Sequence, residues 1–138
     1  MALDYDRDRR HTATEVLRRI DDDTAARLQS CANAEPALIG ERLTELDREW
    51  DTDRAIEAEA SLVALAGLAL GVLVRPAFLA IPTAVGAAVL THAVSGWYPL
   101  LPVFRRLGIR TAREIERERY ALKALRGDFQ EMKPDAPR

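Results

Sequence analysis

The sequence of 138 residues lacks most of the patterns that usually indicate a catalytic or metal site. Its single cysteine, Cys31, excludes a disulfide framework and a cluster of cysteine metal ligands. A formal net charge of −2 lacks the basic excess of nucleic-acid-binding domains, so no nucleic-acid partner is expected. Phosphate-binding glycine loops, an HExxH pair and a nucleophile elbow are also missing. We therefore expect no enzymatic activity, no cofactor and no metal site.

Charge is also missing from one long block of the chain. Residues 60–104 carry a single formal charge, that of Arg75. Residues 1–59 hold 16 acidic and nine basic side chains, whereas residues 105–138 hold six acidic and ten basic ones. The small net charge is thus a cancellation between an acidic arm and a basic tail. An uncharged block of this length is typical of membrane-inserted segments and predicts the lipid bilayer as a partner.

The uncharged block breaks at Arg75 and Pro76. A single helix over residues 60–98 would be about 58 Å long at roughly 1.5 Å per residue. The hydrocarbon core of a bilayer is only about 30 Å thick, and Arg75 would lie near its middle. A turn at Arg75 and Pro76 removes both problems. It predicts two membrane helices, at about residues 53–74 and 77–98, that form an all-α helical hairpin.

The distribution of basic residues predicts the orientation of this hairpin. Within 20 residues of the block, three arginines precede it and seven basic residues follow it, whereas its turn holds only Arg75. The positive-inside rule then places both termini in the cytoplasm. Residues 1–59 lack an early apolar region, so no cleavable signal peptide is expected. The alternative is a soluble helical bundle with two buried central helices, which in a chain this small requires a tight oligomer.

Small residues recur at four-residue spacing in both predicted membrane helices. Gly67 and Gly71 form a GxxxG pattern in the first helix, and Ala80, Ala84 and Ala88 follow the same spacing in the second. Because lipid supplies no hydrophobic force between helices, close backbone approach at small residues holds membrane helices together. We predict that these five residues pack the two helices together or face a second copy of the hairpin in a homo-oligomer.

Two side chains with reactive potential lie in apolar surroundings. His92 is the only titratable residue within the second predicted helix, and a membrane histidine is a functional candidate. It has no acidic or cysteine partner at helical spacing, which favours a neutral histidine bonded to a nearby backbone or hydroxyl group. Cys31 lies on an apolar stripe of the N-terminal arm, which favours a structural thiol over a reactive one.

The N-terminal segment, residues 1–49, is predicted to be a charged cytoplasmic arm made of amphipathic helices. The acidic run Asp21–Asp23 is a point at which its first helix divides in two. Pro36 suits the first turn of a second helix, which is expected to run almost continuously into the first membrane helix.

The C-terminal segment is predicted to resume helical structure after an irregular stretch at residues 99–102, which contains two prolines. Thr111 and Glu114 have the spacing of a capping box, so a charged cytoplasmic helix is expected within residues 110–129. It is expected to be a solvated or membrane-surface helix that packs on the oppositely charged arm, and the alternative is a helix that binds a partner protein. Residues 130–138 are expected to be disordered.

The segment from Gly96 to Ile109, with a Gly-Trp-Tyr-Pro sequence followed by Arg-Arg-Leu-Gly-Ile, resembles the YgaP-like transmembrane domain family. This family comprises two-helix domains of unknown function in the bacterial inner membrane, and the resemblance covers about residues 50–109. It implies a multi-pass protein of that membrane. Tyr98 stands where a cysteine is common in the family, so a thiol role at that position is absent. Some family members carry a rhodanese domain, which implies a partner in sulfur metabolism.

Three classes of function follow from these observations. The first is a non-enzymatic inner-membrane hairpin that anchors or scaffolds a partner. The second is an oligomeric transport component for a small solute or sulfur compound, although residues 60–98 offer few polar side chains to line a pore. The third is a thiol enzyme that uses Cys31, and it has the least support because that cysteine is solitary.

Overall fold

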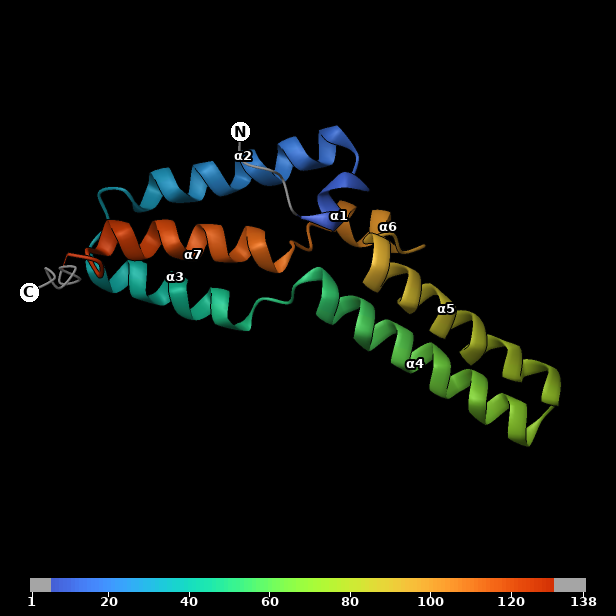
Figure 1. The fold of residues 1–138 in the computed structure, drawn as a ribbon. Helices are drawn as coiled ribbons and strands as arrows, with labels where there is room; N and C mark the ends of the chain where they lie inside the picture. The colour runs from blue at the N-terminus through green and yellow to red at the C-terminus, as the bar shows by residue number, and fades with distance from the viewer. Residues whose placement is uncertain (1–5, 131–138) are drawn as a thin grey trace, which may run out of the picture.

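The computed structural model describes residues 6–130, which form helices joined by short connections (Figure 1). No β-strand occurs within this range, so the prediction of an all-α chain is confirmed. The elements, in chain order, are α1 (Arg7–Arg10), α2 (Thr14–Cys31), α3 (Pro36–Arg48), α4 (Thr52–Leu73), the 3₁₀ turn η1 (Pro76–Leu79), α5 (Ala80–Ser95), α6 (Leu101–Arg106) and α7 (Ala112–Arg126).

Helices α2, α3 and α7 lie side by side and form a bundle, in which α3 runs opposite to the other two (Figure 1). Its apolar core is small, and α3 and α7 supply the buried members. These are Ile39, Leu43, Leu46, Ile115 and Leu122, with Leu28 and Cys31 of α2 packed against them. The bundle therefore brings residues from both ends of the chain into one unit.

Helices α4 and α5 run antiparallel and project from one end of this bundle (Figure 1). Helix α4 has 22 residues and is about 33 Å long at roughly 1.5 Å per residue. It and the combined segment Pro76–Ser95 are both long and apolar enough to cross a membrane. We refer to α4, η1 and α5 as the hairpin.

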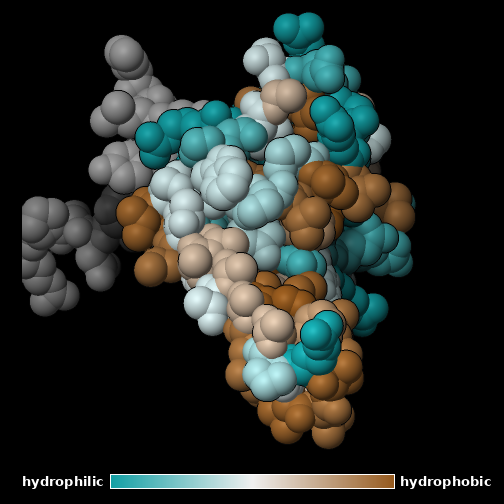
Figure 2. Space-filling view, turned by 90° about the vertical axis from the view of Figure 1, so that its right-hand side faces the viewer, coloured by the Kyte–Doolittle hydropathy of each residue, from teal (hydrophilic) through white to brown (hydrophobic). Residues whose placement is uncertain are grey.

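The hairpin exposes its large apolar side chains. Leu62, Val72 and Leu73 retain 70%, 73% and 82% of their solvent-accessible surface. In the most apolar 18-residue stretch of Pro76–Ser95, only 6% is buried. Figure 2 looks onto the side from which the hairpin projects and shows hydrophobic side chains gathered over the lower part of the view, with most of the hydrophilic ones above them. The two apolar helices are therefore not the buried core of this chain, and their exposed apolar surface is compatible with a membrane environment.

Local sequence explains where the hairpin begins and ends. Asp51 accepts a hydrogen bond from the backbone N–H of Arg54 at 2.8 Å, which caps the first turn of α4. Helix α5 ends at Ser95 and is followed by Gly96, whose φ of +79° lies in the left-handed region that favours glycine. A Cβ atom at Gly96 would also overlap the side chain of Arg7, so this glycine lets α1 approach the hairpin closely.

The second apolar segment differs from the predicted helix at residues 77–98. It begins with η1, becomes α-helical only at Ala80 and ends at Ser95. The expected irregular stretch at residues 99–102 is also partly wrong, because α6 begins at Leu101. Pro102 lies in the first turn of α6, where its missing N–H would have no helical partner in any case.

Two expectations for the N-terminal arm are also wrong. The run Asp21–Asp23 does not divide α2, which is continuous, and Asp21 forms an ion pair with Arg9 outside the helix. Helix α3 does not continue into α4, because Glu49 is extended and the N–H of Thr52 donates to the carbonyl of Arg110 at 2.9 Å. The predicted disordered tail lies, apart from its first residue, outside the described residues.

Candidate functional site

The two glycines of the GxxxG pattern lie against the second arm of the hairpin. A Cβ atom built on Gly67 would lie 2.7 Å from the Cβ of Ile81, and one on Gly71 would lie 2.5 Å from Cδ2 of Leu79. Real Cβ atoms do not approach other carbons this closely, so a larger residue at Gly67 forces the two arms apart, whereas one at Gly71 requires the side chain of Leu79 to move. Both glycines are buried in this contact.

The predicted alanines of the second helix are placed differently from one another. Ala88 packs against a small apolar cluster that includes Ile56 at the base of the hairpin. Ala80 and Ala84 are exposed and do not belong to that cluster. Of the five small residues, Gly67, Gly71 and Ala88 thus lie in contacts within the chain. The other two, Ala80 and Ala84, face outward.

The base of the hairpin holds the side chains with the most chemical potential. The Nε2 atom of His92 on α5 lies 3.0 Å from Oδ1 of Asp53 on α4. The expected backbone or hydroxyl partner for His92 is therefore wrong, because its partner is a carboxylate from the other helix. Spacing within one helix could not reveal this contact, since the two residues are 39 positions apart.

Asp8 of α1 is the third member of this group. Its Oδ2 atom accepts a hydrogen bond from the buried hydroxyl of Thr52 at 2.6 Å. Burial raises the pKa of the Asp8 carboxyl above its ordinary value, although the bond from Thr52 and the nearby His92 act against this shift. Asp8 is thus a buried carboxylate held in a fixed orientation beside a second carboxylate and an imidazole.

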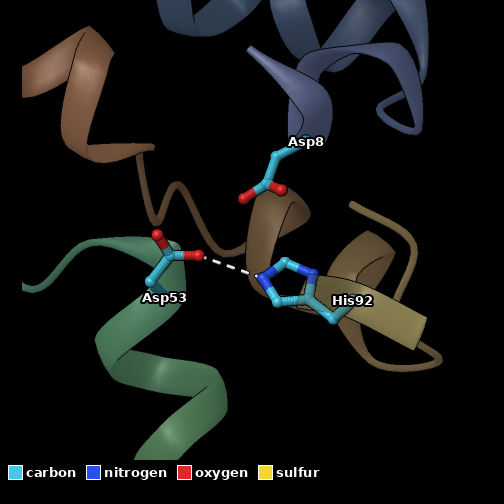
Figure 3. A group of neighbouring side chains, drawn as sticks. All are labelled: Asp8, Asp53 and His92. Atoms are coloured by element: carbon cyan, nitrogen blue, oxygen red, sulfur yellow. Dashed lines mark hydrogen bonds and ion pairs between the residues drawn. The ribbon is translucent and has the colours of Figure 1, made fainter. Parts of the chain in front are cut away.

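Figure 3 shows Asp8, Asp53 and His92 converging from three separate elements. One potential ligand atom from each side chain lies within 4.8 Å of those of the other two. The side chain of Asp53 is 61% exposed, whereas Asp8 and His92 are buried. We call this group the junction cluster, and sequence reasoning missed it because only the folded chain brings α1 beside the hairpin.

Tyr98 lies next to the junction cluster, and its ring meets that of His92 edge to face with 6.0 Å between centroids. Its hydroxyl donates to Oε2 of Glu59 at 2.6 Å. Burial, together with this hydrogen bond, raises the pKa of Tyr98 to about 12. Tyr98, which stands where a cysteine is common in the YgaP-like family, is therefore a buried tyrosine with a structural contact.

A network of buried ion pairs joins α1 and α6 to the first turn of α7. Arg105 is fully buried and donates to both carboxylate oxygens of Glu114 at 2.7 Å each. Glu114 also accepts from Arg9, and with Thr111 it forms the capping box that the sequence predicts. Although burial raises the pKa of Glu114, the bonds from Arg105 and Thr111 outweigh it and hold the pKa below its usual value.

Glu118, one turn further along α7, is the centre of a second set of ion pairs. It is fully buried and accepts from Arg110 and, at 2.9 Å, from Arg42. Burial acts to raise its pKa, but these two arginines hold the pKa below its usual value. Arg110 also donates to both oxygens of Glu49, at 2.6 and 2.7 Å. Charges that look like a solvated helical face in the sequence therefore form part of the interior.

Cys31, the predicted candidate for thiol chemistry, is partly buried at the end of α2. It packs against the apolar core that α3 and α7 form, which is the structural environment that its apolar stripe favours. Its position is far from the junction cluster along α2, at the opposite end of the bundle (Figure 1).

Comparison with known proteins gives no match: the chain matches no protein-family model, no curated protein and no solved structure. The resemblance to the YgaP-like family thus stays a prediction from the segment at residues 96–109.

Proposed function

We propose that this protein is a small membrane anchor, in which the hairpin inserts into the bacterial inner membrane and the bundle holds a partner at the cytoplasmic face. One observation carries the proposal. Large apolar side chains of α4 and α5 point outward along the hairpin, while several charged side chains, among them Arg105 and Glu118, are buried elsewhere in the chain. A soluble chain of this size would turn the large apolar side chains of such helices inward and expose polar ones.

The polar groups of the hairpin have the distribution that a membrane segment requires. Asp53, Glu57 and Glu59 all lie in the first two or three turns of α4, and His92 lies in the last turn of α5. Both sets therefore belong to the end nearest the bundle. Arg75 lies at the opposite end, in the turn between the two arms, where its long side chain reaches the far headgroups. The segment between these ends carries no charge.

Both termini are proposed to be cytoplasmic because the basic residues flank the hairpin on the side of the bundle. A labelling experiment tests insertion and orientation together. In a Cys31→Ser background, Arg75→Cys places a thiol at the tip of the hairpin and Ser30→Cys places one on an exposed position of α2. Intact spheroplasts are treated with a membrane-impermeant maleimide, and inverted membrane vesicles are treated in the same way.

The proposal expects the tip thiol to react in spheroplasts and the α2 thiol to react only in inverted vesicles. Resistance of the protein to extraction by alkaline carbonate is expected in the same membranes. Release by carbonate would contradict insertion. Reaction of both thiols from the cytoplasmic side alone would show that the hairpin enters the membrane without crossing it.

The anchored partner is proposed to bind the bundle, whose α7 leaves Leu125 and Tyr120 largely exposed. Crosslinking in native membranes followed by mass spectrometry would identify that partner, with Leu125→Glu as a variant that removes apolar surface without touching the buried ion pairs. Crosslinks that Leu125→Glu leaves unchanged would exclude this face of α7.

A further inference from the structure

We propose that Asp8, Asp53 and His92 bind a divalent transition-metal ion, so that the junction cluster is a metal site linking α1 to both arms of the hairpin. This inference goes beyond the anchoring function and does not depend on it. The three side chains come from α1, α4 and α5, and a potential ligand atom of each lies within 4.8 Å of the other two. A single ion between them would contact all three.

Two of the three ligands are held in place before any ion binds. The hydroxyl of Thr52 fixes one oxygen of Asp8 at 2.6 Å and leaves the other oxygen available. The ring of Tyr98 packs against the imidazole of His92 at an interplanar angle of 74°. Outer contacts of this kind orient metal ligands and are a regular part of metal sites.

The imidazole of His92 is incompletely satisfied by the protein. Its Nε2 atom faces Asp53, but its Nδ1 atom is buried and has no hydrogen-bond partner among the described residues. A buried polar atom without a partner costs free energy and calls for an explanation. Because Nε2 is the nitrogen that faces the cluster, an ion would bind there, and this strong interaction would hold the ring in place although Nδ1 stays unpaired.

The charges around the junction cluster also favour a cation. Two cavities of about 220 and 230 Å³ open beside it. Their linings carry four carboxylates but only two guanidinium groups, and the cavities give an ion and a water molecule a path to the site. The charged lining residues are Asp6, Asp8, Asp53, Glu57, Arg7 and Arg113.

The buried carboxylates of α7 show what the junction cluster lacks. Glu114 and Glu118 each have at least two arginine partners. Within residues 6–130, no arginine or lysine forms an ion pair with Asp8 or Asp53, and the ion pair of Asp53 is with His92. A metal ion would supply the positive charge that arginines supply elsewhere in the same molecule.

The ligand set indicates the class of metal. One imidazole nitrogen and two carboxylate oxygens suit Zn²⁺, which uses nitrogen and oxygen ligands and often binds three protein ligands and a water. Ca²⁺ prefers six to eight oxygen ligands, a number that these side chains do not offer. The exposed side of Asp53 leaves room for the water in the fourth position.

Isothermal titration with Zn²⁺ tests the proposal on the full chain in detergent, after treatment with a chelator and its removal. The wild type is expected to bind one equivalent saturably, and Asp53→Asn and His92→Gln are each expected to weaken binding at least about tenfold. His11→Gln is the matched control, because the second histidine bonds to the carbonyl of Ser95 and lies outside the cluster.

Thermal unfolding supplies a second measurement on the same samples. Zn²⁺ should raise the melting temperature of the wild type and of His11→Gln, but not that of Asp53→Asn. Asp53 is largely exposed, so its variant is expected to keep the fold, and circular dichroism checks this. Absence of saturable Zn²⁺ binding to the wild type would overturn the proposal, as would equal binding by all the variants.

Discussion

In the bundle, charged side chains lie inside, whereas in the hairpin large apolar side chains lie outside. Glu114 and Glu118 of α7 are buried, while Leu73 exposes most of its side chain. The two regions are therefore held together by different physical means. In the bundle, each buried charge is matched by an opposite one, and in the hairpin, glycines let two helices touch closely.

This difference has a direct consequence for how each region fails. Removing one member of a buried ion pair leaves the other charge in a poorly solvated position, which costs much more than the pair itself contributes. Adding volume at a helix contact forces the backbones apart. The bundle should therefore respond to charge and pH, and the hairpin should respond to side-chain size.

The largest expected effect is that of Glu118→Ala in the bundle. The change leaves Arg110 and Arg42 without their shared buried partner, so the free energy of unfolding should fall by about 3–5 kcal/mol. Urea unfolding in mild detergent, followed by circular dichroism, measures this loss. Asp47→Ala is the control, because its ion pair with Arg119 is exposed and should contribute about 0–1 kcal/mol. Equal losses in the two variants would contradict a buried network.

Acid should weaken the bundle before it affects the hairpin. The pKa values of Glu114 and Glu118 are lowered from 4.5 in the folded chain, so their stabilisation is present above the unfolded pKa. It is lost as pH falls below about 4.5 and through the lowered folded values. Asp8 acts in the opposite direction, since its pKa is raised and its protonation at low pH favours the folded state.

Thermal melts between pH 7 and pH 3 measure this dependence. Glu118→Gln should show a shallower loss of stability with falling pH, because one of the two titrating carboxylates has been removed. A wild-type melting temperature that does not fall below pH 4.5 would show that the buried pairs contribute little to stability.

In the hairpin, the corresponding test is one of volume. Gly67→Ala adds a methyl group where a Cβ atom would lie 2.7 Å from Ile81, so the hairpin should lose about 1–3 kcal/mol of stability. Gly86→Ala is the matched control, because nothing lies within 4 Å of its Cβ position. Unfolding by sodium dodecyl sulfate, followed by circular dichroism, compares the two variants. If both variants are equally stable, close contact at Gly67 does not hold the helices together.

The features that sequence predicts well here are those with a local cause. The long uncharged block predicts two apolar helices because membrane insertion depends on the composition of a continuous segment. The capping box at Thr111 and Glu114 follows from a three-residue spacing and is present. A local rule also explains one error: prolines at residues 99–102 suggest irregular structure, but Pro102 is acceptable in the first turn of α6.

The candidate site depends on contacts that no local pattern carries. Asp8 and Asp53 are 45 positions apart along the chain, and Asp53 and His92 are 39 apart. Their meeting depends on how α1 packs onto the base of the hairpin. The same holds for Glu118, which looks like one of many alternating charges in α7 until α3 and the segment near Arg110 enclose it. Contacts between helices that are far apart in the sequence depend on how the helices are placed against each other. The spacing of residues along a single sequence does not show this placement.

The smallest expected effect tests the boundary between the two regions. Tyr98→Phe removes one hydrogen bond, from the phenol to Glu59, and keeps the ring against His92, so stability should fall by about 1 kcal/mol. Tyr120→Phe is the matched control, because Tyr120 is exposed and stacks on Phe129 through its ring.

An absorbance titration of the phenols gives an independent reading of the same contact. Because burial and Glu59 raise the pKa of Tyr98 to about 12, the wild type should retain an un-ionised tyrosine at pH 11 that Tyr98→Phe lacks. A wild type whose tyrosines are all ionised by pH 11 would mean that water reaches this hydroxyl. The base of the hairpin would then be open rather than sealed against the bundle, and the contrast between a packed interior and an apolar, exposed exterior would begin further along α4.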